Sequence, residues 1–308
     1  MKVTIDLDQL LADGEISQDE HDRFSQFAAR ETASLAFNIL LGFGIAAVSG
    51  GALALVPTPT TAIILGSAVG ATGIALTHAR VAWWMVLANI CVVVGALLFG
   101  GGVIVAGEGS VGALLLVAAA LAGGAIVAQN AFLIVLAVLA LASCLDARTG
   151  YRHAMYAPGM NEPALTVVLF SVFSVATYQF SKRLAAAYQS LALAAARTGV
   201  ILVNFGFWIG SLWGDQWESV DRVIPAGLFS LLWAIGLIAT GAWGWRNNRR
   251  WVVNAAAIFG GIHFYTQWFE RLGASPATVL VGGLAALGFA VGLRALNVER
   301  TASRDRTV

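Results

Sequence analysis

Charge is scarce in this sequence. Only 11% of the 308 residues are Asp, Glu, Lys or Arg, whereas about 25% is usual for a soluble domain. So few charged side chains cannot cover the water-facing surface of a chain of this length, which excludes a soluble globular protein. The net charge of +1 comes without a basic patch. A nucleic-acid partner is therefore excluded, because phosphate binding needs clustered Lys and Arg.

Residues that ligate metals or act as nucleophiles are equally few. The two cysteines, Cys91 and Cys144, lie in apolar runs and lack the spacing of metal ligands. The four histidines are scattered without an HExxH pair, and no serine lies in a G-x-S-x-G motif. We therefore predict no metal site, no cofactor and no catalytic residue, and an enzyme is the weakest of the function classes considered.

Long apolar runs, by contrast, are abundant. A helix needs about 20 apolar residues to cross a bilayer, and ten segments approach that length. We predict a transmembrane helix over each of them: 33–56, 60–77, 81–106, 110–128, 130–146, 163–181, 198–214, 223–244, 250–269 and 276–296. The predicted fold is all-α, a polytopic bundle of about ten spans.

The stretch 110–146 decides the topology, since only Gln129 and Asn130 interrupt it. Cytoplasmic loops collect Lys and Arg. With two spans in this stretch and the N-terminus inside, 14 of the 18 basic residues face the cytoplasm and 4 face out. With one span the split becomes 8 against 10, and the bias vanishes. We therefore predict two spans, an even total, and both termini in the cytoplasm.

The first 31 residues carry many charges and no apolar run, which predicts that they are not a cleavable signal peptide. They predict a cytosolic helical hairpin, followed by the transmembrane bundle over 32–298 and a cytosolic tail over 299–308. The first helix ends at Gly14, and Ser17 followed by Glu20 is a capping-box pattern for the second. One face of the first helix carries Leu7, Leu10 and Leu11. The hairpin is either a cap on the membrane surface or a docking site for a cytosolic protein.

An internal repeat is suggested by asparagines that precede a glycine by six residues. The pairs are Asn38/Gly44, Asn89/Gly95, Asn204/Gly210 and Asn254/Gly260. The first two asparagines are 51 residues apart and the last two are 50 apart. Spans 1–3 would then be related to spans 7–9 in the same orientation, as in transporters built from parallel repeats.

Small and aromatic residues indicate where helices touch. Glycines spaced four apart let two backbones approach in lipid, and they occur at Gly66/Gly70, Gly206/Gly210/Gly214 and Gly288/Gly292. Most tryptophans fall near predicted span ends, where amphipathic rings favour the headgroup level. Trp208 and Trp233 fall deeper, so we expect them to pack between helices.

Polar groups inside spans are the candidate functional residues, because an ionisable group is costly in a membrane. The clearest is His263, in the segment 249–271 that opens on two arginines and closes on Glu270 and Arg271. Tyr265 and Gln267 follow it, and Glu270 lies two helical turns along on the same face. A His263–Glu270 pair could relay a proton or bind a cation. Alternatively, His263 bonds a neighbouring helix and Glu270 pairs with Arg271.

The intramembrane asparagines also have two interpretations. Asn38, Asn89, Asn204 and Asn254 could line a polar pathway, or they could bond across helices and hold the bundle together. Asp215 and the other acids of the outer loops are expected to be solvated.

Two functions follow from these alternatives. One is a transporter or channel-like protein for a small solute or lipid. The other is a non-transporting scaffold or sensor that acts through the N-terminal hairpin. The lipid bilayer is the expected partner of both, and a cytosolic protein at 1–31 and a second copy in a homo-oligomer are candidate partners.

Two segments resemble a known family. The opening LxxLLADGEISQDEHDRF and the late HFYTQWFERLGASPATVLVGGLAALG are similar to the bacterial membrane proteins grouped as DUF2157. The resemblance implies an all-helical protein of the bacterial inner membrane with a short cytosolic N-terminal domain. It implies no activity, because the family is defined by its unknown function. The loop 147–162 is not matched to that family by these motifs.

Overall fold

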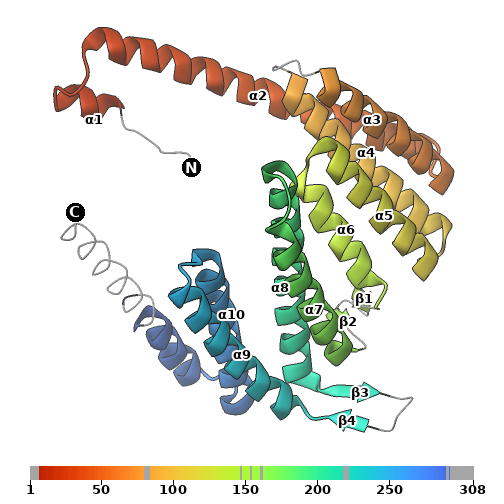
Figure 1. Ribbon diagram of the computed structural model, residues 1–308, viewed down its shortest axis with the longest axis vertical. Helices are drawn as coiled ribbons and strands as arrows, with labels where there is room; N and C mark the ends of the chain where they lie inside the picture. The colour runs from red at the N-terminus through yellow and green to blue at the C-terminus, as the bar shows by residue number, and fades with distance from the viewer. Residues whose placement is uncertain are drawn as a thin grey trace. The chain divides into compact units, whose positions relative to one another are not determined.

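The computed structural model describes residues 7–79, 84–145, 148–152, 155–159, 162–217, 222–288 and 291. The chain is helical, with two short pairs of antiparallel strands (Figure 1). In chain order the elements are α1 (Leu7–Ala12), α2 (Gln18–Leu55), α3 (Pro59–Ala79), α4 (Met85–Ala106), α5 (Val111–Ala128), α6 (Ala131–Ser143), β1 (Arg148–Arg152), β2 (Met155–Gly159), α7 (Pro163–Ser181), α8 (Ala186–Trp213), β3 (Asp215–Trp217), β4 (Arg222–Ile224), α9 (Ala226–Arg246) and α10 (Arg250–Leu272). A further helix, Pro276–Gly288, follows α10.

The chain divides into two compact units. The first combines Met1–Cys144 with Tyr178–Ala195, and the second combines Leu145–Thr177 with Ala196–Val308. The first unit therefore contains α1 to α6, and the second contains both strand pairs, α9, α10 and most of α7 and α8.

Six helices in the described part of the chain are long and apolar enough to cross a membrane: α3, α4, α5, α7, α8 and α9. The length and apolar composition of these six helices support a membrane protein. Each of the ten predicted spans overlaps a helix in the described part of the chain, but the count of ten spans is not confirmed. The apolar parts of three helices are shorter, namely Leu40–Leu55 in α2, α6, and Pro276–Gly288. The stretch 249–271 forms α10 but is not among the six, since arginines, amides and a histidine interrupt its apolar residues.

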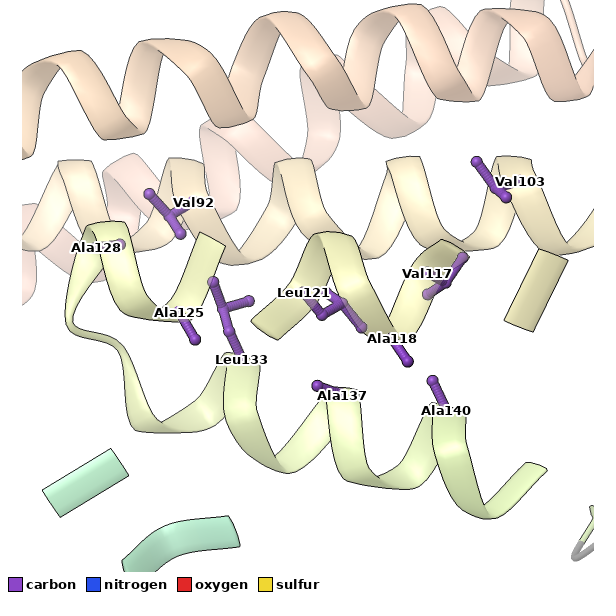
Figure 2. Close-up of a cluster of buried hydrophobic side chains, with 10 residues drawn as sticks. All are labelled: Val92, Val103, Val117, Ala118, Leu121, Ala125, Ala128, Leu133, Ala137 and Ala140. Atoms are coloured by element: carbon purple, nitrogen blue, oxygen red, sulfur yellow. The ribbon is translucent and has the colours of Figure 1, made fainter. Parts of the chain in front are cut away.

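The core of the first unit lies where α5 packs between α4 and α6 (Figure 2). Val92 and Val103 of α4 face α5, and Leu121 of α5 and Leu133 of α6 complete the buried cluster. Most of its other members are alanines, whose small side chains let the helices approach closely. The loss of any one large side chain would therefore leave a gap that alanines cannot fill.

The connection between α5 and α6 confirms that 110–146 forms two helices. Gln129 ends α5 in the left-handed conformation, with φ of 50°. Asn130 then caps α6, because its side-chain oxygen accepts hydrogen bonds from the backbone N–H groups of Phe132 and Leu133. A tight turn between helices needs a residue that ends the first helix and a residue that caps the second. Gln129 does the first and Asn130 does the second.

Helices α3 and α4 touch through their backbones. A Cβ built on Gly66 would lie 2.3 Å from the backbone nitrogen of Phe99, and one on Gly95 would lie 2.3 Å from the nitrogen of Gly70. Such distances leave room only for hydrogen atoms, so glycine is required at both positions. The predicted role of Gly66 as a helix-contact residue is confirmed, whereas Gly288 has nothing within 4 Å of its Cβ position.

The N-terminal residues form the predicted pair of helices. Gly14 follows α1 in the left-handed region, with φ of 72°. The capping box is present: the backbone N–H of Glu20 donates to Ser17 Oγ at 3.4 Å, and the N–H of Ser17 donates to Glu20 Oε2 at 2.9 Å. The second helix does not end at residue 31, however. It continues as α2 to Leu55, because no proline or glycine interrupts it before Gly42.

The two strand pairs were missed by the sequence interpretation, which assigned 147–162 to a loop and included most of β4 in the predicted span 223–244. Strands β1 and β2 pair with Tyr151 opposite Tyr156, and β3 and β4 pair with Gln216 opposite Val223. Each strand has three to five residues. Segments this short have no clear alternation of polar and apolar residues, so periodicity could not reveal them.

Glycines and one carboxylate position α8 in the second unit. Gly206 brings α8 against α7, since a Cβ there would lie 2.9 Å from Val167 Cγ2. Gly210 faces the ring of Phe229 on α9, since a Cβ on Gly210 would lie 2.5 Å from Phe229 Cδ1. Directly after α8, Asp215 Oδ2 accepts a hydrogen bond from the backbone N–H of Ala164, in the first turn of α7. The predicted contact roles of Gly206 and Gly210 are thereby confirmed.

Candidate functional site

The main polar cluster of the second unit joins α8, α9 and α10. At its centre the indole N–H of Trp233 donates to Asn204 Oδ1 at 2.9 Å. The amide of Asn204 donates to the carbonyl of Val200 in its own helix at 2.8 Å. Trp233 is 1% exposed and Asn204 is 9% exposed, so this cross-helix bond is shielded from its surroundings. Trp233 packs between helices, as predicted.

His263 on α10 joins the cluster through α9. Its Nε2 lies 2.9 Å from the carbonyl oxygen of Ser230 and 3.3 Å from Ser230 Oγ. Because a carbonyl can only accept, the Nε2 atom carries the hydrogen and Nδ1 of the neutral ring is left as an acceptor. The ring also contacts Trp233 edge-on, with centroids 4.9 Å apart. His263 therefore bonds a neighbouring helix, the second of the two predicted alternatives.

One turn further along α10 lies the amide of Gln267. Its Nε2 atom is buried without a hydrogen-bond partner among the described residues. The adjacent Thr266 accepts a hydrogen bond from the indole of Trp208 at 3.0 Å. Residues 263 and 267 lie on the same helical face. This face thus presents one bonded imidazole and one amide that lacks a partner.

The opposite face of α10 bonds the following helix. The hydroxyl of Tyr265 donates to the carbonyl of Gly282 at 2.9 Å, and the indole of Trp268 donates to the carbonyl of Thr278 at 3.2 Å. Tyr265 is therefore engaged in helix packing. With His263 and Thr266 on one side and these two residues on the other, α10 is held by hydrogen bonds on both faces.

The predicted pair of His263 and Glu270 is not joined by a bond. His263 finds its partners on α9, whereas Glu270 is exposed. Within the described part of the chain, Glu270 forms no ion pair with Arg271 either. The reason is geometric, because two helical turns of about 11 Å separate the two side chains and no third group bridges them.

The four repeat asparagines lie in different environments. Asn89 on α4 donates to the carbonyl of Met85 and accepts from the amide of Asn130 at 3.3 Å, within the first unit. Asn204 is buried against Trp233, whereas Asn254 is exposed on α10. Asn38 lies in α2, but its side chain is outside the described residues. The repeat itself stays a prediction.

Asp215 departs from its predicted place in a solvated loop. It is 6% exposed, and its Oδ1 atom is buried without a partner while Oδ2 caps α7. The sequence offered no sign of this, because Asp215 becomes buried only when the end of α8 meets the start of α7. Elsewhere in the described ranges, no group of three or more His, Cys, Asp or Glu side chains could hold a metal ion.

Comparison with models of protein families, with curated proteins and with solved structures gave no match. The resemblance of the chain's two ends to DUF2157 proteins therefore stays a prediction from the motifs quoted above.

Proposed function

We propose that the protein is a multi-pass membrane scaffold or sensor that acts through its N-terminal hairpin. In this proposal it lies in the bacterial inner membrane as a DUF2157-type protein, with about ten spans and both termini in the cytoplasm. The observation that carries it is the continuity of α2. One helix runs from the capping box at Ser17 to the end of the apolar segment Leu40–Leu55.

A continuous helix couples its two ends mechanically. The 22 residues from Gln18 to Ile39 precede the apolar segment and span roughly 33 Å at 1.5 Å a residue. The hairpin is thus connected to the apolar segment through a helix and not through a flexible linker. Binding at the hairpin or a movement of the apolar segment would be transmitted to the other end, as a sensor requires.

The intramembrane polar groups support the same proposal. Asn204, His263 and Tyr265 each bond a neighbouring helix of the second unit. A side chain that already has a protein partner must give it up before it can bind a solute. These residues are therefore better suited to holding helices together than to lining a pathway.

The proposed topology draws on the coincidence of ten helices with ten apolar runs. Placing all ten across the bilayer puts 14 basic residues inside and 4 outside, in agreement with the usual bias. The shorter helices would cross where the hydrocarbon layer thins locally, at a modest cost per ångström.

The scaffold proposal is tested by complementation. A strain lacking the protein would receive the full chain, the chain without residues 1–31, or the His263→Ala/Glu270→Ala variant, each at matched membrane levels. We expect the shortened chain to behave like the empty strain and the double variant to restore the full chain's phenotype. Restoration by the shortened chain but not by the double variant would refute the proposal.

A transporter or channel-like protein is the second candidate, and Gln267 favours it. A buried amide without a partner costs about 1–3 kcal/mol, so its Nε2 atom calls for a partner from outside the chain, such as water or a polar solute. His263 Nδ1, an acceptor one turn away, would bind the same molecule. We expect proteoliposomes to take up solute only if Gln267 is intact. Equal uptake by Gln267→Leu and the full chain would exclude this role.

A further inference from the structure

The contact between α1 and α2 includes a histidine, His21, that must be protonated to bond both of its carboxylate neighbours. His21 of α2 lies between two carboxylates, with Nε2 3.0 Å from Asp8 Oδ1 and Nδ1 3.5 Å from Asp22 Oδ1. An ionised carboxylate only accepts hydrogen bonds. Both ring nitrogens must therefore carry a hydrogen for both contacts to form, and that is the charged imidazolium. A neutral ring can satisfy only one of the two carboxylates.

The same contact decides where α1 lies. Helix α1 has only six residues, too few to be stable as an isolated helix in water. It lies against the first turns of α2 (Figure 1), with its leucines half-buried. The bond from His21 to Asp8 spans 13 residues of sequence, whereas Asp22 is the direct neighbour of His21. Of the two carboxylate contacts of His21, the one to Asp8 is therefore the one that joins α1 to α2.

We propose that the N-terminal hairpin is a pH-sensitive latch, in which protonated His21 holds α1 against α2 and its deprotonation releases α1. The charged groups that face His21 are Asp8 from α1 and Asp22 from α2, and the amide of Gln18 donates to the same Asp22 oxygen at 3.2 Å. The His21 side chain is 17% exposed whereas that of Asp8 is 93% exposed, so α1 can detach without uncovering a buried carboxylate.

The direction of the switch follows from linkage. The hydrogen bond to Asp8, followed by the one to Asp22, raises the pKa of His21 above its ordinary 6.5. A group whose pKa is raised in the folded state stabilises that state fully below the unfolded pKa. The contribution is lost as the pH rises through the raised value. The latch is therefore closed in mildly acidic conditions. It opens as the pH rises through the pKa of His21, which lies above that of an ordinary histidine.

The latch is tested by spin-label mobility in the full chain in lipid nanodiscs. A nitroxide on Ala12→Cys, an exposed position of α1, would be the sole label after Cys91→Ala and Cys144→Ala. Its spectrum would be followed from about one pH unit below the ordinary histidine pKa to about two above. We expect the mobile fraction of the label to rise about two- to five-fold over this pH range. That is the change in the equilibrium between attached and released α1 that the loss of one exposed ion pair produces.

Three variants complete the design. His21→Gln should abolish the pH response, and Asp8→Asn should abolish it too without altering His21. His78→Gln is the matched control, because that exposed histidine bonds the carbonyl of Ile74 in its own helix, and it should leave the response intact. A flat profile in the unaltered chain, or an unchanged response in both latch variants, would overturn the proposal. The latch does not depend on a partner of the hairpin, so it stands or falls independently of the scaffold function.

Discussion

Replacing Gly95 with alanine should separate α3 from α4. The Cβ of alanine at this position would lie 2.3 Å from the nitrogen and 2.5 Å from the Cα of Gly70, both backbone atoms. Ordinary van der Waals contact begins near 3.4 Å, so the two helices must move apart by about 1.1 Å. No rotation of a side chain can relieve this clash.

The size of the effect follows from overpacking. Forcing an extra carbon into a well-packed contact costs about 1–3 kcal/mol. Replacement of helical glycine by alanine also contributes a favourable propensity of up to about 1 kcal/mol. Gly70→Ala is the matched control, because its Cβ would lie 3.8 Å from the nearest atom, Gly95 Cα. The propensity gain is common to both variants and cancels in their difference.

Reversible unfolding in mixed detergent micelles, followed by circular dichroism, measures that difference. We expect the free energy of unfolding of Gly95→Ala to fall about 1–3 kcal/mol below that of Gly70→Ala, roughly a 5- to 150-fold change in the equilibrium constant. Gly101→Ala, with nothing within 4 Å of its Cβ position, should resemble Gly70→Ala. If Gly95→Ala is as stable as these two controls, α3 and α4 do not touch through their backbones.

Three further predictions concern packing and topology. Trp233→Phe should lower the free energy of unfolding, measured thermally or in detergent, by about 1–3 kcal/mol, because it leaves the buried Asn204 oxygen without a donor. Trp213→Phe, at a position 61% exposed, should be neutral. Equal effects of the two variants would contradict the role of the Trp233 bond. Asn130→Ala should cost about 1 kcal/mol by removing the cap of α6, seen as faster amide exchange in its first turn, and unaltered exchange there would count against the cap. Reporter domains fused to the N-terminus and to the C-terminus should both report a cytoplasmic location. A periplasmic signal from one of the two would show an odd number of spans.

The positions of the helices were largely predictable. Apolar runs of sufficient length must be helical in a bilayer because no water is available to bond the backbone, and each run overlaps a helix among the described residues. Local signals also sufficed for ends and turns. The capping box at Ser17 and Glu20 and the Gln129–Asn130 turn depend on residues that are adjacent in the sequence, and both are present.

The candidate site was predicted less completely. His263 and Asn204 stood out because polar groups are rare in the apolar runs. Ser230 did not, and Trp233 was expected only to pack between helices, not to bond Asn204. Proximity on one helix suggested Glu270 as the partner of His263. The partner in the structure, Ser230, lies on another helix, 33 residues away in sequence. The sequence does not indicate which helices are neighbours in the fold.

The sequence alone therefore determined that the chain is helical and carries helices apolar enough to cross a membrane, roughly where most of those helices lie, and that its N-terminal residues form a capped helical pair. Those properties depend on composition and on neighbours within a few residues. Only the tertiary structure decided that Gly95 meets Gly70, that Asn204 bonds Trp233, that Asp215 is buried and that Asp8 faces His21. Each of these depends on how two helices or strands pack, and many arrangements of the same helices satisfy the same hydrophobic pattern.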